Sequence, residues 1–299
     1  MPSSCCANCL TQESTDGGAP LKICVACKMV KYCNRDCQIE HRPQHKTECK
    51  KRAMEIHVEA LFKQPPKSED CPICFVHVPL MATGQKYFVC CGKIICSGCV
   101  HAVALSTNDE VICPFCRTEL SKSNEEKINR FEKRIELFGD TEAMTNLGTF
   151  YLNGNFDLPV DLDKSLSLWH RAAKLGNHEA LHNIGDAYLN GRGVGRDMKK
   201  AKHYWELAAM KGDVMSRHNL GLLEKQNGNM MRALKHYMIA SRQGDSDSLN
   251  AIQRLFMSGF ATRDDYEKAL HAHQEYVQEV RTDQRDAAAA YDERMNTYY

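Results

Sequence analysis

The chain has 299 residues, of which 43% are hydrophobic and 26% charged, and this length fits two or three domains. Its 39 lysines and arginines nearly balance its 38 aspartates and glutamates, giving a net charge of +1. This balance argues against a large phosphate-binding surface and favours proteins over nucleic acid as partners. A nucleic-acid-binding function through fingers would also require concentrated basic surface and base-stacking aromatic residues, which the sequence does not display.

All sixteen cysteines lie between Cys5 and Cys116, so they serve one local purpose in the N-terminal part. Pairs separated by two residues place two thiolates on one tight turn, which is half of a tetrahedral zinc site. The alternative, a disulfide scaffold, needs an oxidising compartment, but residues 1–19 hold no signal-peptide run and no later run is long enough to span a bilayer. We therefore expect zinc binding, no membrane association, and residence in the cytoplasm or nucleus.

The first cysteine-rich segment, residues 1–52, offers eight ligands, enough for two closed structural sites. Their spacing, including Cys33, Cys37 and the final His45-Lys-Thr-Glu-Cys49, resembles the MYND zinc finger. The resemblance implies two interleaved sites, the first formed by Cys6, Cys9, Cys33 and Cys37 and the second by Cys24, Cys27, His45 and Cys49. Cys5 is left over as a spare thiol, and His41 is expected to be an exposed helix residue.

MYND fingers generally bind short, often proline-containing peptides, and the family usually places an acidic residue and a tryptophan shortly before the ligand histidine. Here His41 and Arg42 occupy that place, while Tyr32 and Gln38 match the pattern. Because arginine gives no rigid aromatic wall, we expect weak or absent binding of proline-containing peptides.

A linker, residues 53–69, contains Pro65-Pro66, which opposes continuation of a helix. The second cysteine-rich segment, residues 70–118, resembles a RING finger of the all-cysteine type, because Lys93 stands where most members have a histidine and the doubled Cys90-Cys91 restores eight ligands. The resemblance implies one site formed by Cys71, Cys74, Cys96 and Cys99 and another formed by Cys90, Cys91, Cys113 and Cys116. Together the two modules predict four zinc ions per chain.

Active RING ligases orient a ubiquitin-conjugating enzyme rather than forming a covalent intermediate, and the spare thiol, Cys5, sits in an N-terminal tail. By resemblance, Ile73 and Pro114 would contact the conjugating enzyme, and Arg117 would act as a clamp on that enzyme and ubiquitin. Val103 offers only a small apolar side chain on the following helix. The alternative is a zinc-stapled protein-binding module with no enzymatic activity.

Residues 122–139 predict a connecting helix. Ser123 and Glu126 form a capping-box pattern, and Gly139 marks the end. Apolar residues recur between them at three- and four-residue steps, at Ile128, Phe131, Ile135 and Phe138.

Residues 140–262 contain a repeat, since Asn146-Leu-Gly148, Asn183-Ile-Gly185 and Asn219-Leu-Gly221 recur at 37 and 36 residues. Trp169, Trp205 and Tyr237 follow the same period, which is typical of stacked helical hairpins. The segment resembles Sel-one-like repeats, although the third repeat is about four residues shorter. We expect a degenerate fourth unit and a C-terminal capping helix in residues 263–299.

The histidines scattered through the repeats share no ligand spacing and are expected at the surface or in a groove, for example His170, His182, His203 and His218. A concave repeat face suits a protein partner, so we expect an unknown substrate there. The whole sequence thus predicts a multidomain protein, with two small zinc-stapled N-terminal modules followed by an all-α helical-repeat solenoid. Two functional hypotheses remain open, a RING-type ubiquitin ligase and a non-enzymatic interaction scaffold.

Overall fold

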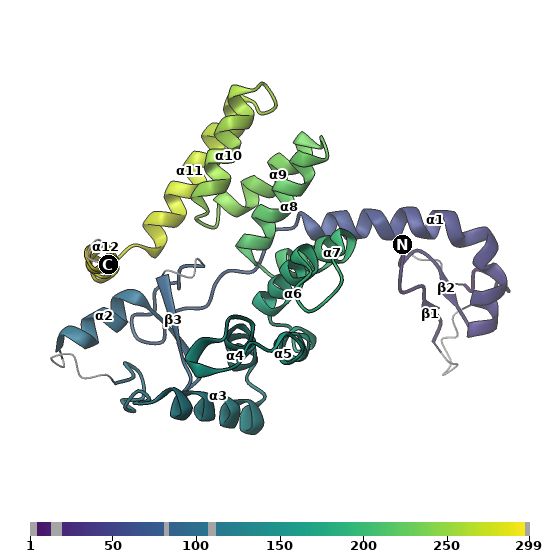
Figure 1. The fold of residues 1–299 in the computed structure, drawn as a ribbon. Helices are drawn as coiled ribbons and strands as arrows, with labels where there is room; N and C mark the ends of the chain where they lie inside the picture. The colour runs from purple at the N-terminus through teal and green to yellow at the C-terminus, as the bar shows by residue number, and fades with distance from the viewer. Residues whose placement is uncertain (1–4, 13–19, 81–83, 107–111, 297–299) are drawn as a thin grey trace. The chain divides into compact units, whose positions relative to one another are not determined.

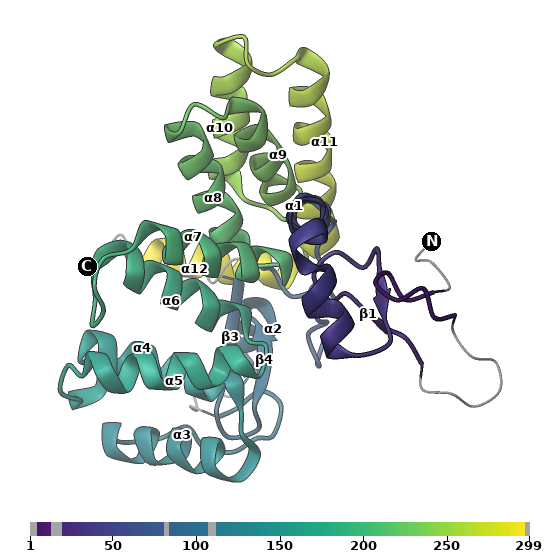
Figure 2. The same ribbon diagram turned by 90° about the vertical axis from the view of Figure 1, so that its right-hand side faces the viewer.

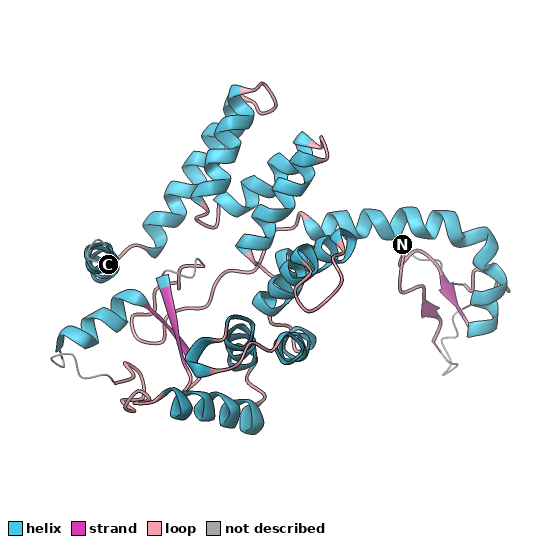
Figure 3. Ribbon diagram, in the orientation of Figure 1, coloured by secondary structure: helices cyan, strands magenta, loops and turns pink. Residues whose placement is uncertain are grey.

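The computed structural model describes residues 5–12, 20–80, 84–106 and 112–296, with the side chains of 292–296 left aside. The chain divides into two compact units, residues 1–63 and 64–299, and each is described by itself (Figures 1 and 3). Among the described residues, no helix combines the length and apolar character that crossing a membrane would require.

The first unit is a small finger built on one long helix. Strands β1 (Lys22–Ile23) and β2 (Lys31–Tyr32) pair antiparallel, and α1 (Arg35–Leu61) follows directly. Asn34 caps α1, because its side-chain oxygen accepts a hydrogen bond from the Cys37 amide at 2.8 Å. The cap fixes the first helical turn, and with it the position of Cys37.

The second unit begins with a finger of similar size. Strands β3 (Gln85–Phe88) and β4 (Lys93–Cys96) pair antiparallel, with Gln85 opposite Cys96 and Phe88 opposite Lys93. Helix α2 (Ser97–Ser106) continues from β4. Val78, Phe88 and Ile95 form a buried core with the cysteines around them. Such a core is too small to hold a fold alone, so metal binding must contribute to its stability.

Helix α3 (Asn124–Phe138) connects the finger to the repeats and begins and ends where the sequence predicts. Ser123 accepts a hydrogen bond from the Glu126 amide at 3.1 Å, and Gly139 closes the helix in the left-handed conformation. Phe138 differs from the expectation, since 67% of its surface is exposed. It is the last residue of the helix, where the Arg134 guanidinium lies over its ring instead of a buried neighbour.

The repeats are helical hairpins stacked on one another (Figure 2). Their elements are α4 (Thr141–Asn153), η2 (Asn155–Asp157), α5 (Leu162–Lys174), α6 (His178–Asn190), α7 (Met198–Met210), α8 (Val214–Gln226), α9 (Met230–Ser241), α10 (Ser246–Met257) and α11 (Arg263–Val280). The loop between α6 and α7 spans residues 191–197 and that between α8 and α9 spans 227–229, which is seven against three residues and accounts for the shorter third repeat. This all-α arrangement confirms the predicted fold class.

The repeated glycine and aromatic residues touch each other within each hairpin. A Cβ atom at Gly148 would lie 2.6 Å from the indole nitrogen of Trp169, and one at Gly185 would lie 2.6 Å from the ring of Trp205. The repeated glycine therefore marks the point where the two helices of a hairpin cross, because a residue without a side chain leaves room for the aromatic ring.

Residues 263–299, where we expect the end of a degenerate repeat and a capping helix, contain two helices. Helix α11 packs on α10, as the predicted fourth hairpin requires, but the chain then turns at Arg281 and Thr282 into a separate helix, α12 (Asp283–Asn296). Helix α12 packs mainly on α2 of the finger. Gly98 permits this contact, since a Cβ at Gly98 would lie 2.8 Å from the backbone nitrogen of Arg285.

Candidate metal centres

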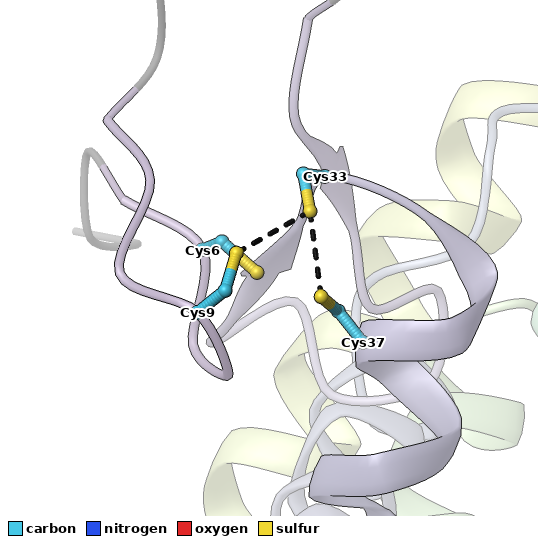
Figure 4. A group of neighbouring side chains, drawn as sticks. All are labelled: Cys6, Cys9, Cys33 and Cys37. Carbon is cyan, nitrogen blue, oxygen red and sulfur yellow. Dashed lines mark hydrogen bonds between the residues drawn. The ribbon is translucent and has the colours of Figure 1, made fainter.

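The first finger brings Cys6, Cys9, Cys33 and Cys37 together (Figure 4). The Cys33 sulfur lies 3.5 Å from the sulfurs of both Cys9 and Cys37. Zinc–sulfur bonds of about 2.3 Å in a tetrahedron place the sulfurs about 3.8 Å apart. The cluster therefore has nearly the size that a zinc ion requires.

Cys24, Cys27, His45 and Cys49 form a second cluster in the same finger. The Cys24 and Cys49 sulfurs lie 3.8 Å apart, and the His45 Nε2 lies 3.2 Å from the Cys27 sulfur. His41 is half-buried rather than exposed, because its ring stacks on that of His45 with centroids 5.6 Å apart and its Nδ1 lies 3.0 Å from the Tyr32 hydroxyl. His41 thus supports the cluster and contributes no ligand to it.

The second finger contains two all-cysteine clusters. In one, the sulfur of Cys71 lies 3.9 Å from that of Cys99, and Cys74 lies 3.8 Å from Cys96. In the other, Cys91 lies 3.8 Å from Cys113, and Cys116 lies 3.4 Å from Cys90. Lys93 is exposed at the start of β4 and takes no part. Both members of the Cys90-Cys91 pair are therefore placed as ligands.

None of the sixteen cysteines, which all lie within the described residues, forms a disulfide. The sulfur separations quoted above are far longer than the roughly 2.05 Å of a disulfide bond. This geometry agrees with a zinc framework and with none of the disulfide pairings.

The electrostatics of the clusters also suit a divalent cation. Burial opposes ionisation of the Cys24 thiol, but hydrogen bonds from the Cys27 amide and from His45 lower its pKa to about 6. Burial and hydrogen bonding to Cys24 raise the pKa of Cys49 to about 12. Only some thiols of a cluster thus ionise readily by themselves, and Zn²⁺ supplies the charge that lets all of them bind as thiolates.

Two family comparisons match parts of the chain. Residues 6–49 match the MYND finger family, over the same eight ligands that the structure brings together. This segment is a MYND finger. Residues 141–177 and 178–213 match the Sel1 repeat, which covers α4 to α7. Neither family covers the second finger, and a search of curated proteins found no match.

Several solved structures are similar to part of this chain. A Sel1 repeat protein from Oxalobacter formigenes shares 22% identity over 61% of this chain and 71% of that chain, with a TM-score of 0.47. The protective antigen c5321 of uropathogenic Escherichia coli, which displays an SLR fold, shares 22% identity over 60% of this chain and 37% of that chain, with a TM-score of 0.45. MamA shares 15% identity over 60% of this chain and 97% of that chain, with a TM-score of 0.34.

In the second finger, Arg285 supports one of the cysteine clusters, and the sequence analysis did not predict this contact. The guanidinium of Arg285 on α12 donates hydrogen bonds to the carbonyl oxygens of His77 at 2.8 Å and Val76 at 3.2 Å, and lies 3.8 Å from the Cys74 sulfur. Burial opposes the charge of Arg285, but Cys96 and Cys74 raise its pKa. Such outer-shell contacts orient metal ligands and tune their charge.

The three residues expected to contact a conjugating enzyme differ in their exposure to solvent. Arg117 is exposed, with a φ of 61° in the left-handed region, and Ile73 is half-buried. Pro114 is buried. Two phenylalanines that the sequence analysis did not single out are exposed beside them, with 77% of Phe75 and 45% of Phe115 accessible. The large exposed apolar side chains of the finger thus include Phe75 and Phe115.

Proposed function

We propose that the second finger acts as a RING-type ubiquitin ligase module, while the MYND finger and the Sel1 repeats recruit the protein to be modified. The observation that carries this proposal is the interleaving of the two cysteine clusters in residues 71–116. The first and third cysteine pairs share one cluster, and the second and fourth share the other. This is the order that the RING resemblance implies.

Such a module would act by orienting the conjugating enzyme and ubiquitin and would form no covalent bond itself. The zinc ions would hold the two cysteine turns in place, and the residues on those turns do the rest. Ile73 would dock the conjugating enzyme, and Pro114 would shape the turn beside it. Arg117, free to reach outward, would hold the enzyme–ubiquitin thioester in its reactive pose. Orientation of this kind can supply several kcal/mol without any titrating side chain.

A second candidate is a non-enzymatic scaffold that binds proteins through its fingers and repeats. The burial of Pro114 and the packing of α12 on α2 favour it, because both reduce the surface open to a conjugating enzyme. Both candidates act in a reducing compartment such as the cytoplasm or nucleus, where the zinc ligands stay unoxidised.

Discharge of a ubiquitin thioester separates the two candidates. Zinc-loaded protein is mixed with activating enzyme, ubiquitin and a panel of conjugating enzymes. We expect Ile73→Ala to abolish discharge by removing docking, and Arg117→Ala to slow it while docking is kept. Lys93→Ala is the matched control, since Lys93 is exposed on the same finger and holds no zinc in this arrangement. Silence across the panel, with zinc content verified and no conjugating enzyme bound, would establish the scaffold.

A further inference from the structure

The MYND finger has a groove of about 560 Å³ that runs beside α1. Six exposed side chains of the helix line it: Arg35, Gln38, Ile39, Arg42, Lys46 and Lys50. They recur at three- and four-residue steps, so they share one face of the helix. The second zinc cluster and Tyr32 form the inner wall.

The charge of this groove has one sign. Four of its side chains are cations, and none of the lining residues is acidic. The carboxylates of the same helix stretch, Asp36, Glu40 and Glu48, do not line the groove, and Glu40 accepts a hydrogen bond from Asn8. Two ion pairs of α1, from Arg52 to Glu55 and to Glu59, lie outside the groove.

The adjoining zinc site does not cancel this charge. Zn²⁺ with three thiolates and a neutral imidazole carries a net charge of −1, so four cations leave the groove with a net charge of about +3. A concave surface with charge of one sign attracts ligands of the opposite sign.

The groove also has apolar contact area but no exposed phenylalanine, tyrosine or tryptophan ring. Ile39 is 56% exposed, whereas Tyr32 is 2% exposed and its hydroxyl contacts His41. Single-stranded nucleic acids that bind in basic grooves stack their bases on aromatic side chains, and this groove exposes no phenylalanine, tyrosine or tryptophan. A peptide needs only an apolar side chain for Ile39 and carboxylates for the cations.

We propose that this groove binds an acidic segment of a partner protein, with an apolar residue over Ile39 and carboxylates on Arg35, Arg42, Lys46 and Lys50. Along its axis, α1 rises about 22 Å from Arg35 to Lys50, and Pro43 inside this stretch bends the helix (Figure 1), so this rise is the upper limit of the span. An extended peptide covers that length with about seven residues. The inference is independent of the ligase activity, because it concerns the other finger and is tested by binding alone.

The test uses the full, zinc-loaded chain and fluorescence anisotropy. The probe is a labelled nine-residue peptide with a central leucine flanked by glutamates and aspartates, and its matched control carries glutamine and asparagine instead. We expect the acidic peptide to bind about tenfold or more tightly than the neutral one, and its affinity to fall as salt rises. Arg42→Glu should weaken binding about tenfold, whereas Lys51→Glu, the same charge change on α1 outside the groove, should change it less than about twofold.

Three results would overturn the proposal. One is equal binding of the acidic and neutral peptides. Another is equal loss with Arg42→Glu and Lys51→Glu, which would mean diffuse attraction to a solvated helix. The third is tighter binding of a nine-nucleotide oligothymidylate that Arg42→Glu abolishes, which would make the ligand a nucleic acid. Zinc content and helical circular dichroism of each variant show that a loss of binding is not a loss of folding.

Discussion

Arg285 is placed to balance charge at the second finger. A zinc ion with four thiolates carries a net charge of −2, and the guanidinium lies 3.8 Å from the Cys74 sulfur while its other bonds fix the backbone at Val76 and His77. The same side chain holds α12 against the finger. One residue therefore links a metal site to the C-terminal helix.

Replacing Arg285 by alanine should weaken zinc binding by the cluster of Cys71, Cys74, Cys96 and Cys99 about 10- to 100-fold. Competition with a chromogenic chelator measures the release. Arg281→Ala is the control, since Arg281 pairs with Asp286 at 2.8 Å on the exposed side. Identical release curves for the two variants would show that Arg285 has no role at the metal.

We expect Arg42 to decide which class of peptide the MYND finger binds. Without an aromatic wall, the wild-type finger should bind proline-containing peptides weakly, and Arg42→Trp should strengthen that binding by providing the wall. Titration of a proline-containing peptide into both proteins checks this. Micromolar binding by the wild type would contradict it.

At the scale of the helices, one ladder of polar contacts joins successive repeats. Asn177, Asp213 and Asp245 each cap the first helix of a hairpin, by accepting a bond from an amide three residues on. Each also bonds a side chain on the preceding hairpin, Thr145, His182 and His218 respectively. His182 and His218, for which the sequence predicts a place at the surface or in a groove, are half-buried, with 14% and 16% of their side chains exposed. Their carboxylate partners allow this burial.

The ladder predicts a pH dependence of repeat stability. Burial opposes protonation of His182, but its bond to Asp213 raises its pKa, and burial raises the pKa of Glu142 to about 7. A raised folded-state pKa gives stability that is complete below the unfolded pKa and is lost as pH rises through the folded one. The pKa of Asp213 is lowered, despite burial, by bonds from His178 and His182, so its contribution is lost only in acid.

We therefore expect the repeats to lose stability, on the order of 1 kcal/mol, as the pH rises from about 4.5 through about 7 for Glu142 and above about 6.5 for His182. Urea unfolding followed by tryptophan fluorescence reports on this part alone, because both tryptophans, Trp169 and Trp205, lie in the repeats. His182→Gln should flatten the profile, and His203→Gln, an exposed control, should not. Stability that rises over this range would contradict the assignment.

Local spacing explains how much of the fold the sequence could predict. Cysteine pairs, Ser123 and Gly139, and the glycine–aromatic period all encode contacts within a turn, a helix end or one hairpin. Arg285 and Cys74 are 211 residues apart, and no spacing relates them. The basic groove was missed for another reason, because Arg35, Arg42, Lys46 and Lys50 alternate with acidic residues along the chain, and only the turn of the helix separates the two kinds.

On the scale of the molecule, the second finger and the repeats form one unit. Tyr87 of β3 packs on Phe131, the Tyr276 hydroxyl of α11 accepts a hydrogen bond from the Leu80 amide at 3.0 Å, and the rings of His101 and Tyr291 lie 5.3 Å apart. The finger is thus joined to both ends of the repeat region.

Chelation should therefore unfold more than residues 1–117. We expect both fingers to lose hydrogen-exchange protection and α12 to lose it with them, while α6 to α9 stay protected by their own core. Most of the helical circular dichroism should survive. Cooperative loss of the entire helical signal would mean that the repeats cannot stand without zinc.

The central claim is that residues 6–116 hold four structural zinc ions, and native mass spectrometry of protein expressed with ample zinc tests it most directly. The four clusters predict four zinc ions on the intact chain. Because Cys90 and Cys91 are both placed as ligands, Cys90→Ser and Cys91→Ser should weaken the binding of one zinc ion to the same extent. Two ions or fewer on the wild-type chain would contradict the account, since at least one finger would then fold by other means.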